Sequence, residues 1–92
     1  MTNNIILYSS NNCAYCSRAK KLLDTLGLSF KEINIQIDLN ERDIMLSRSN
    51  GRRTVPQIFI NNQHIGGYDD LVKIVSNGEY KSLLNNESSG LV

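Results

Sequence analysis

The stretch IILYSSNNCAYCSRAKKLLDTLG, residues 5–27, decides how the chain begins to fold. Residues 5–8 form a short apolar run that ends in polar SSNN, which predicts a buried strand followed by a loop. From Ala14 onward apolar residues recur at helical spacing, and Gly27 stands where the end of a helix favours a positive φ. The apolar positions of this predicted helix are Ala19, Leu22, Leu23 and Leu26. The stretch therefore predicts a strand, a loop and a helix, with both cysteines of the chain where the helix begins.

The middle of the chain predicts a strand, then a helix, and then two strands joined by a tight turn. SFKEINIQI alternates apolar and polar side chains and predicts a second strand over residues 30–35. Asn40 can cap a helix over residues 41–49, which Gly51 follows. QIFI and HIGG, separated by NNQ, predict a hairpin, because Asn tolerates the positive φ that tight turns need.

Two more helices complete the predicted domain. Asp69 and Asp70 begin a third helix that ends before Gly78, and EYKSLLNN adds a short fourth. We expect one domain over residues 1–86 and a loose tail, ESSGLV, over residues 87–92. A parallel strand–helix–strand unit followed by a helix, a hairpin and a packing helix predicts an α/β fold. Its core is a four-stranded mixed sheet with helices on both faces.

Composition argues against several broad classes. The chain has 92 residues, 40% of them apolar, and its 10 Lys and Arg against 9 Asp and Glu give a formal net charge of +1. A balance this close to neutral argues against nucleic acid or an anionic membrane as the main partner. The apolar runs are far shorter than the roughly 20 residues of a membrane-spanning helix, and the first residues lack the pattern of a signal peptide. We therefore expect a cytoplasmic protein, or one in an organellar matrix.

The pair Cys13 and Cys16 allows several interpretations. As a permanent disulfide it closes a very short loop, which stabilises a fold little in the chain-entropy model. A zinc site needs about four N or S ligands, and the chain offers these two cysteines and His64. Buried apolar thiols suit only Cys16, because Cys13 directly follows a polar loop. A dithiol that cycles with a disulfide fits the position after a first strand and at the start of a helix.

The start of a helix favours chemistry at Cys13. Unpaired N–H groups and the positive end of the helix dipole stabilise a thiolate there, which makes Cys13 the predicted nucleophile. Cys16 lies one turn further in and is the predicted resolving thiol. At positions i and i+3 the two side chains share one helix face, so a disulfide can form without unwinding the helix.

Two further stretches carry candidate site residues. Pro56, the only proline, stands just before a predicted strand; about 5 to 6% of X–Pro bonds in folded proteins are cis, so the residues alone favour a trans bond. In GGYDD, residues 66–70, two glycines allow a ligand to come close, and a helix N-terminus offers N–H groups to a carboxylate. A plain turn and helix cap is the simpler interpretation of GGYDD by itself.

Taken together, IILYSSNNCAYC and RRTVPQIFINNQHIGGYDDL resemble the glutaredoxin family, and the resemblance covers nearly the whole chain. It implies a thioredoxin fold and a cis Val55–Pro56 bond. It also implies thiol–disulfide exchange on protein disulfides and glutathione mixed disulfides, with glutathione as the reductant. No permanently bound cofactor and a monomeric protein are expected from the same resemblance.

The resemblance also implies how glutathione is held. The backbone of Val55 pairs with the cysteine of glutathione, Tyr15 flanks the sulfur, and Arg52 or Arg53 meets the glycine carboxylate, with Gln57 as a further candidate for that contact. The γ-glutamyl end lies at the start of the third helix, where N–H groups take its carboxylate and an aspartate takes its ammonium. The implied glutathione-binding residues are Tyr15, Arg52, Arg53, Thr54, Val55, Pro56, Gly67, Tyr68, Asp69 and Asp70.

Three positions depart from the family pattern. Ala14 replaces the proline that the family usually has between its cysteines, and some members without this proline hold a [2Fe-2S] cluster between two subunits. A cluster-bridged dimer that uses Cys13 is therefore the alternative function. Ser10 stands where a lysine is common, which leaves the arginines to meet the glycine carboxylate, and Tyr68 is bulkier than the small residue usual there. A redoxin fed by a flavoprotein reductase is a third hypothesis, against which RRTVP and GGYDD argue.

Overall fold

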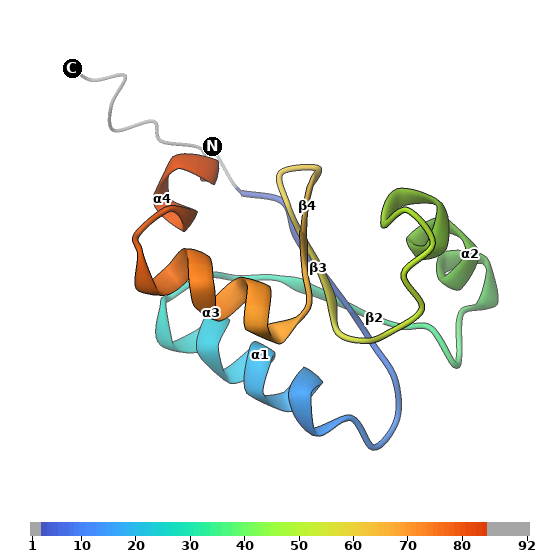
Figure 1. The fold of residues 1–92 in the computed structure, drawn as a ribbon. Coiled ribbons are helices and arrows are strands. Elements are labelled where there is room, and N and C mark those ends of the chain that lie inside the picture. The colour runs from blue at the N-terminus through green and yellow to red at the C-terminus, as the bar shows by residue number, and fades with distance from the viewer. Residues whose placement is uncertain (1–2, 85–92) are drawn as a thin grey trace.

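Residues 3–84, the part of the chain that this computed structural model describes, form four strands and four helices (Figure 1). The strands are β1 (Ile5–Ser9), β2 (Lys31–Asn34), β3 (Gln57–Ile60) and β4 (Gln63–Gly66). The helices are α1 (Ala14–Thr25), α2 (Leu39–Arg48), α3 (Tyr68–Ser76) and α4 (Tyr80–Leu83). Within the described residues, no helix is both long and apolar enough to cross a membrane. The predicted boundary at residue 86 and the predicted tail lie outside the described residues.

The sheet has the strand order β2-β1-β3-β4. β1 runs parallel to β2 and antiparallel to β3, and β3 runs antiparallel to β4, which confirms the predicted mixed sheet. Tyr8, near the end of β1, pairs with Gln57 at the start of β3. The loop that follows β1 and the loop that precedes β3 therefore lie side by side at the same end of the two central strands.

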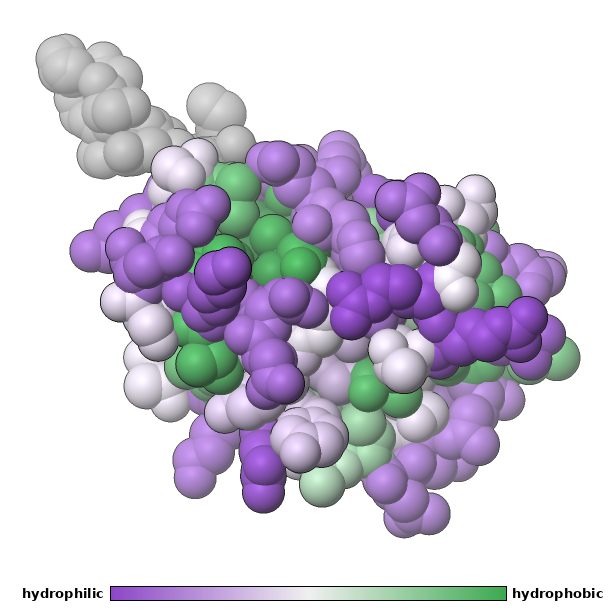
Figure 2. Space-filling model, in the orientation of Figure 1, coloured by the Kyte–Doolittle hydropathy of each residue, from purple (hydrophilic) through white to green (hydrophobic). Residues whose placement is uncertain are grey.

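Helices cover both faces of the sheet, as predicted, and each face has its own apolar cluster (Figure 1). Ile5, Leu7 and Ile58 pack with residues of α1 and α3, while Tyr8 and Phe59 pack with residues of α2. The alternation follows from the strand geometry, in which successive side chains point to opposite faces. On the side of the molecule drawn in Figure 2, apolar residues reach the surface in small patches between polar ones. The buried apolar side chains thus pack the helices against the two faces of the sheet.

The turn between β3 and β4 confirms the predicted hairpin. Asn61 and Asn62 have φ values of 49° and 71°, the left-handed region that Asn adopts more readily than most residues. The side chain of Asn61 also accepts a hydrogen bond from the N–H of Asn4 at 2.7 Å and donates one to the carbonyl of Leu83 at 2.8 Å. This turn residue therefore ties the hairpin to the start of β1 and to α4.

Two predicted helix starts are wrong by one or two residues. α2 begins at Leu39 and its cap is Asp38, not Asn40, because the Asp38 carboxylate accepts a hydrogen bond from the N–H of Glu41 at 3.1 Å. α3 begins at Tyr68, one residue earlier than predicted, and Gly67 is its cap. The sequence predicts the second strand over residues 30–35. The observed strand, β2, spans Lys31–Asn34 and is one residue shorter at each end.

Candidate active site

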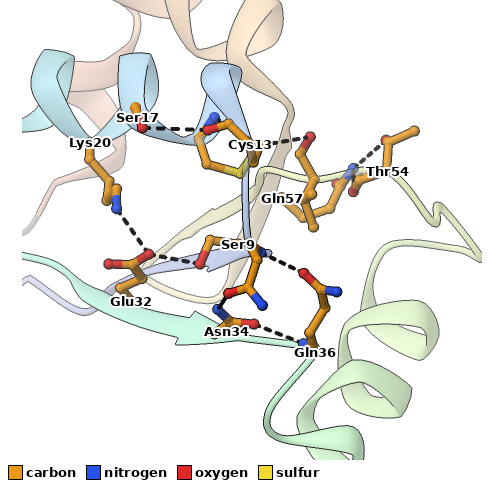
Figure 3. Close-up of a disulfide and its surroundings, with 12 residues drawn as sticks. Ser9, Cys13, Ser17, Lys20, Glu32, Asn34, Gln36, Thr54 and Gln57 are labelled. Carbon is orange, nitrogen blue, oxygen red and sulfur yellow. Dashed lines mark hydrogen bonds and ion pairs between the residues drawn. A yellow bond between two sulfur atoms is a disulfide. The ribbon is translucent and has the colours of Figure 1, made fainter.

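The cysteine pair lies at the start of α1, where the sequence predicts it. Cys13 and Cys16 are joined by a disulfide, and Cys13 caps the helix with an extended backbone, its sulfur accepting a hydrogen bond from the N–H of Cys16 at 3.1 Å (Figure 3). Cys13 is half-buried, whereas Cys16 is only 2% exposed. An N–H group aimed at Cys13 and the helix dipole both favour negative charge on that sulfur once the disulfide is reduced.

The loop before β3 forms the second part of the site. The Val55–Pro56 peptide bond is cis, which confirms the expectation from the family resemblance and corrects the trans bond that the residues alone favour. The carbonyl oxygen of Val55 lies 3.8 Å from the sulfur of Cys13. The backbone of this loop therefore faces the Cys13 sulfur.

One pocket of about 250 Å³ collects almost all of the residues that the resemblance implies for glutathione. It extends from the cis-proline loop to the start of α3. The residues that line it are Tyr15, Arg52, Thr54, Val55, Pro56, Gly67, Tyr68, Asp69 and Asp70. Arg53 is not among them and lines a separate pocket of about 360 Å³ beside α2, together with Arg42 and Met45. Gln57 is fully buried and does not line the pocket of about 250 Å³ either.

The polar groups at the α3 end of the pocket form hydrogen bonds and an ion pair with one another. Asp70 accepts a hydrogen bond from the N–H of Gly67 at 3.0 Å and also lies 3.5 Å from the guanidinium of Arg52. Gly66 has a φ of +118°, and a Cβ atom there would collide with the Asp70 carboxylate and lie 2.9 Å from Arg52. Gly66 is therefore required for this arrangement, and Asp69, which is exposed, is the acidic side chain better placed to meet a ligand's cation.

Aromatic side chains border the pocket near the sulfur. The rings of Tyr15 and Tyr68 lie 5.9 Å apart at an interplanar angle of 33°, and the guanidinium of Arg18 lies 5.2 Å from the centre of the Tyr15 ring. Tyr15 is 55% exposed, so its ring remains available to a ligand. The sequence shows that Tyr68 departs from the family pattern, but it gives no sign that Tyr68 contacts Tyr15, because the two residues lie far apart along the chain.

A polar network on the other side of the cysteines was not predicted. Glu32 of β2 accepts a hydrogen bond from the hydroxyl of Ser9 at 2.8 Å and pairs with Lys20 of α1 at 3.0 Å (Figure 3). These contacts, the Ser9 hydrogen bond first, hold the pKa of Glu32 below its ordinary value of 4.5. Asn34 donates to Asn11 at 2.9 Å, which ties the loop before Cys13 to the end of β2. No sequence pattern reveals these contacts, because they depend on the pairing of β1 with β2.

The structure gives no support to a zinc site. Within residues 3–84, no three His, Cys, Asp or Glu side chains lie close enough together to hold a metal ion. His64 is turned toward Gln57, with its Nε2 atom 2.6 Å from the Gln57 oxygen. His64 is therefore engaged with Gln57 in this structure and does not form a group of three metal ligands with the two cysteines.

The fold and this site define a thiol–disulfide oxidoreductase with a thioredoxin fold. The family model described as glutaredoxin matches residues 5–65, and the chain belongs to the glutaredoxin family. Glutaredoxin 3 of Escherichia coli strain K12 is 48% identical over 81 residues, which are 88% of this chain and 96% of that protein. Glutaredoxin 1 of Rickettsia prowazekii is 39% identical over 84 residues, 90% of this chain and 88% of that protein.

Solved structures agree with this assignment. A buckwheat glutaredoxin–glutathione complex is similar with a TM-score of 0.78 and 36% identity, over 89% of this chain and 76% of that one. Glutaredoxin from Brucella melitensis is similar with a TM-score of 0.75 and 44% identity, over 88% of this chain and 87% of that one. The similarity thus extends over the sheet and the helices that build the site.

Proposed function

We propose that this protein uses glutathione to reduce protein disulfides and glutathione mixed disulfides through Cys13 and Cys16. The observation that carries the proposal is the position of the Cys13 sulfur. The sulfur accepts a hydrogen bond from the N–H of Cys16 at the start of α1 and faces the carbonyl of Val55. Val55 in turn lines the pocket that carries charged side chains at the start of α3. A tripeptide thiol with a backbone beside its sulfur and charges at both ends matches that arrangement.

The proposed exchange on a glutathione mixed disulfide has two steps. The Cys13 thiolate attacks the glutathione sulfur, a Cys13–glutathione disulfide forms, and the other thiol leaves as a thiolate that takes up a proton. A second glutathione, as its thiolate, then attacks the glutathione sulfur of this adduct. Oxidised glutathione is released and the Cys13 thiolate is restored. In total, the mixed disulfide and one free glutathione give the free thiol and oxidised glutathione, so one glutathione is consumed per turnover.

Protein disulfides use the second cysteine in this proposal. Cys13 attacks one sulfur of the substrate, and a mixed disulfide forms between the two proteins. Cys16 then attacks Cys13, the reduced substrate leaves, and the Cys13–Cys16 disulfide remains. The burial of Cys16 suits this role, because a buried thiol keeps its proton until an adduct forms next to it. Two glutathione molecules reduce the disulfide again.

The pocket suggests how glutathione is oriented. Its cysteine backbone pairs with Val55 in an extended contact, and Tyr15 covers the sulfur. N–H groups at the start of α3 donate hydrogen bonds to the γ-glutamyl carboxylate, and Asp69 meets the ammonium. Arg52 supplies positive charge for a carboxylate of the ligand, whereas Arg53 has no role in this arrangement because it lines the other pocket.

The remaining parts of the proposal concern partners. Glutathione is the reductant and co-substrate, no cofactor is permanently bound, and the protein acts as a cytoplasmic monomer. The alternative of a dimer bridged by a [2Fe-2S] cluster on Cys13 stays a prediction that rests on Ala14, which is exposed beside that cysteine.

Two single substitutions test the reaction. The assay is reduction of a small glutathione mixed disulfide, measured as the formation of oxidised glutathione. We expect Cys13→Ser to abolish the reaction, because no thiolate is left to attack. We expect Cys16→Ser to keep it, because a second glutathione resolves the adduct. Unchanged activity in Cys13→Ser would contradict the proposed function.

A further inference from the structure

Gln57 is a fully buried polar side chain next to the cis-proline loop, and both the nitrogen and the oxygen of its amide have hydrogen-bond partners. Its amide nitrogen donates hydrogen bonds to the carbonyl oxygen of Thr54 at 3.0 Å and to the Thr54 hydroxyl at 3.2 Å (Figure 3). Its amide oxygen lies 2.6 Å from the Nε2 atom of His64. Gln57 therefore links a residue of β4 to the loop that faces Cys13.

The partners determine where the protons are. The carbonyl oxygen of Thr54 can only accept a hydrogen bond, so the amide nitrogen of Gln57 must face Thr54 and its oxygen must face His64. An amide oxygen can also only accept, so the Nε2 atom of His64 must carry a proton. Conversely, the Nε2–H group of His64 fixes which way the Gln57 amide is turned.

The surroundings of His64 keep its ring neutral and in place. Burial first, and then the positive charge of Arg52, lower the pKa of His64 below 6.5, against the opposing effect of Asp70. The His64 ring lies 4.9 Å from the ring of Phe59, its cross-strand partner, and the guanidinium of Arg48 lies 4.7 Å from the Phe59 ring. Both the lowered pKa and the contact with Phe59 favour a neutral imidazole that keeps this position.

Thr54 needs this support because the rest of the residue is exposed. Its carbonyl and hydroxyl are both held from beneath by the same amide group, and the next residue is Val55, whose carbonyl faces the Cys13 sulfur at 3.8 Å. A change in the orientation of Gln57 would release Thr54 and allow the Val55 backbone to move relative to that sulfur.

We propose that His64 is a positioning residue for thiol–disulfide exchange: through Gln57 it holds Thr54, and so holds the Val55 backbone where the peptide part of the substrate pairs beside Cys13. The inference rests on the proposed function, because the substrate pairing with Val55 is part of it. His64 takes no part in the transfer of protons or electrons.

A matched pair of substitutions tests the inference. His64→Phe keeps a ring against Phe59 but removes the N–H donor, whereas His64→Gln keeps a donor of similar reach. For a small glutathione mixed disulfide, we expect His64→Phe to raise KM about three- to tenfold, the effect of losing roughly one hydrogen bond in substrate positioning, with a smaller change in kcat. We expect His64→Gln to return KM to near the wild-type value.

Two further measurements separate positioning from general damage. The pKa of the Cys13 thiol, followed by its thiolate absorbance, should be the same in both variants and in the wild type, because α1 is untouched. The ring nitrogen NMR shifts of His64 should show the proton on Nε2, and the backbone shifts of Thr54 and Val55 should move in His64→Phe but not in His64→Gln.

The outcomes distinguish this inference from the proposed function. A wild-type KM in His64→Phe, equal impairment in both variants, or a proton found on Nδ1 would overturn the role of His64 while the proposed function stands. If the wild type shows no glutathione-dependent activity, the proposed function fails instead. The NMR shifts of Thr54 and Val55 then still decide whether His64 holds the loop.

Discussion

Arg52 and Arg53 are adjacent and carry the same charge, yet they serve different surfaces. Arg52 lines the pocket beside the cis-proline loop and lies 3.5 Å from Asp70, while Arg53 lines the pocket beside α2. Successive side chains of an extended segment point in opposite directions, so one residue of difference is enough to separate them. The family resemblance allows either arginine to meet a glutathione carboxylate, and the course of the backbone favours Arg52.

This separation predicts unequal effects of two matched substitutions. We expect Arg52→Gln to weaken glutathione binding about fivefold, because it removes a charged donor from the pocket. Arg53→Gln changes the net charge of the protein by the same amount and should leave affinity within about twofold of the wild type. Isothermal titration of the reduced proteins with glutathione measures both. Equal losses in the two variants would indicate general electrostatic attraction rather than a contact in the pocket.

The two cysteines also differ through position alone. Cys13 caps α1, is half-buried and receives an N–H group, whereas Cys16 lies one turn further along and is 2% exposed. The reactivity of a thiol depends on its thiolate fraction and its accessibility, and both favour Cys13. The place where α1 begins thus makes Cys13 the more accessible of the two sulfurs and the better stabilised as a thiolate.

At the scale of elements, the loop between β1 and α1 is held by contacts to β2. Ser9 and Lys20 flank this loop on the two sides, and both bind the carboxylate of Glu32. The loop itself is tied down by Asn11, which accepts a hydrogen bond from Asn34. Contacts to β2 therefore hold the end of β1, helix α1 and the loop between them, which carries Cys13.

The lowered pKa of Glu32 predicts a pH dependence of stability. Its pKa is lower in the folded protein than the ordinary 4.5, so the folded state binds fewer protons near that pH than the unfolded state. The stabilisation is present above pH 4.5 and is lost as the pH falls below it toward the folded pKa. We expect Glu32→Gln to be less stable than the wild type at neutral pH and to approach the wild type in acid.

Urea unfolding followed by circular dichroism, at neutral pH and below pH 4.5, measures this difference. Asp43→Asn is the control, because the Asp43 side chain is 73% exposed on α2 and its carboxylate lies 3.9 Å from the guanidinium of Arg42. Its effect should be small at both pH values. A Glu32→Gln difference that grows on acidification would show that the carboxylate does not stabilise the fold.

Sequence reasoning works best for elements whose signals are local. The hairpin turn follows from Asn61 and Asn62, whose side chains tolerate the backbone angles that a tight turn requires. The cis bond before Pro56 does not follow from local energetics, which favour trans, and needed the family resemblance. The cap of α2 was misplaced because Asp38 and Asn40 are both good capping residues, and the sequence alone does not decide between them.

Side-chain contacts between strands could not be predicted from the sequence. The hydrogen bond between Gln57 and His64 depends on the register of β3 and β4, which shifts between Ile58 and Phe59. A shift of one residue in such a register moves side chains to the other face, so the pairing cannot be read from two separated segments. The site could therefore be located from its motifs, while the contacts that support it required the fold.

At the scale of the whole molecule, the sheet topology assembles the site from three distant segments. The end of β1 lies beside the start of β3, which brings the loop before α1 to the cis-proline loop. β4 then returns the chain so that α3 begins next to both. The segments 13–16, 52–56 and 67–70, apart from the side chain of Arg53, come together as one surface only when the complete sheet is formed.

One ligand on that surface must perturb all three segments together. In a titration of the reduced protein with reduced glutathione, we expect backbone NMR shifts in residues 13–16, 52–56 and 67–70 to move and to saturate at the same concentration. Residues of α2 should remain unaffected, since they line the other pocket. Cysteinylglycine, which lacks the γ-glutamyl end, should move the first two segments and leave the start of α3 unchanged. Segments that saturate at different concentrations, or shifts centred on Arg42 and Met45, would mean that the three segments do not bind glutathione as one site.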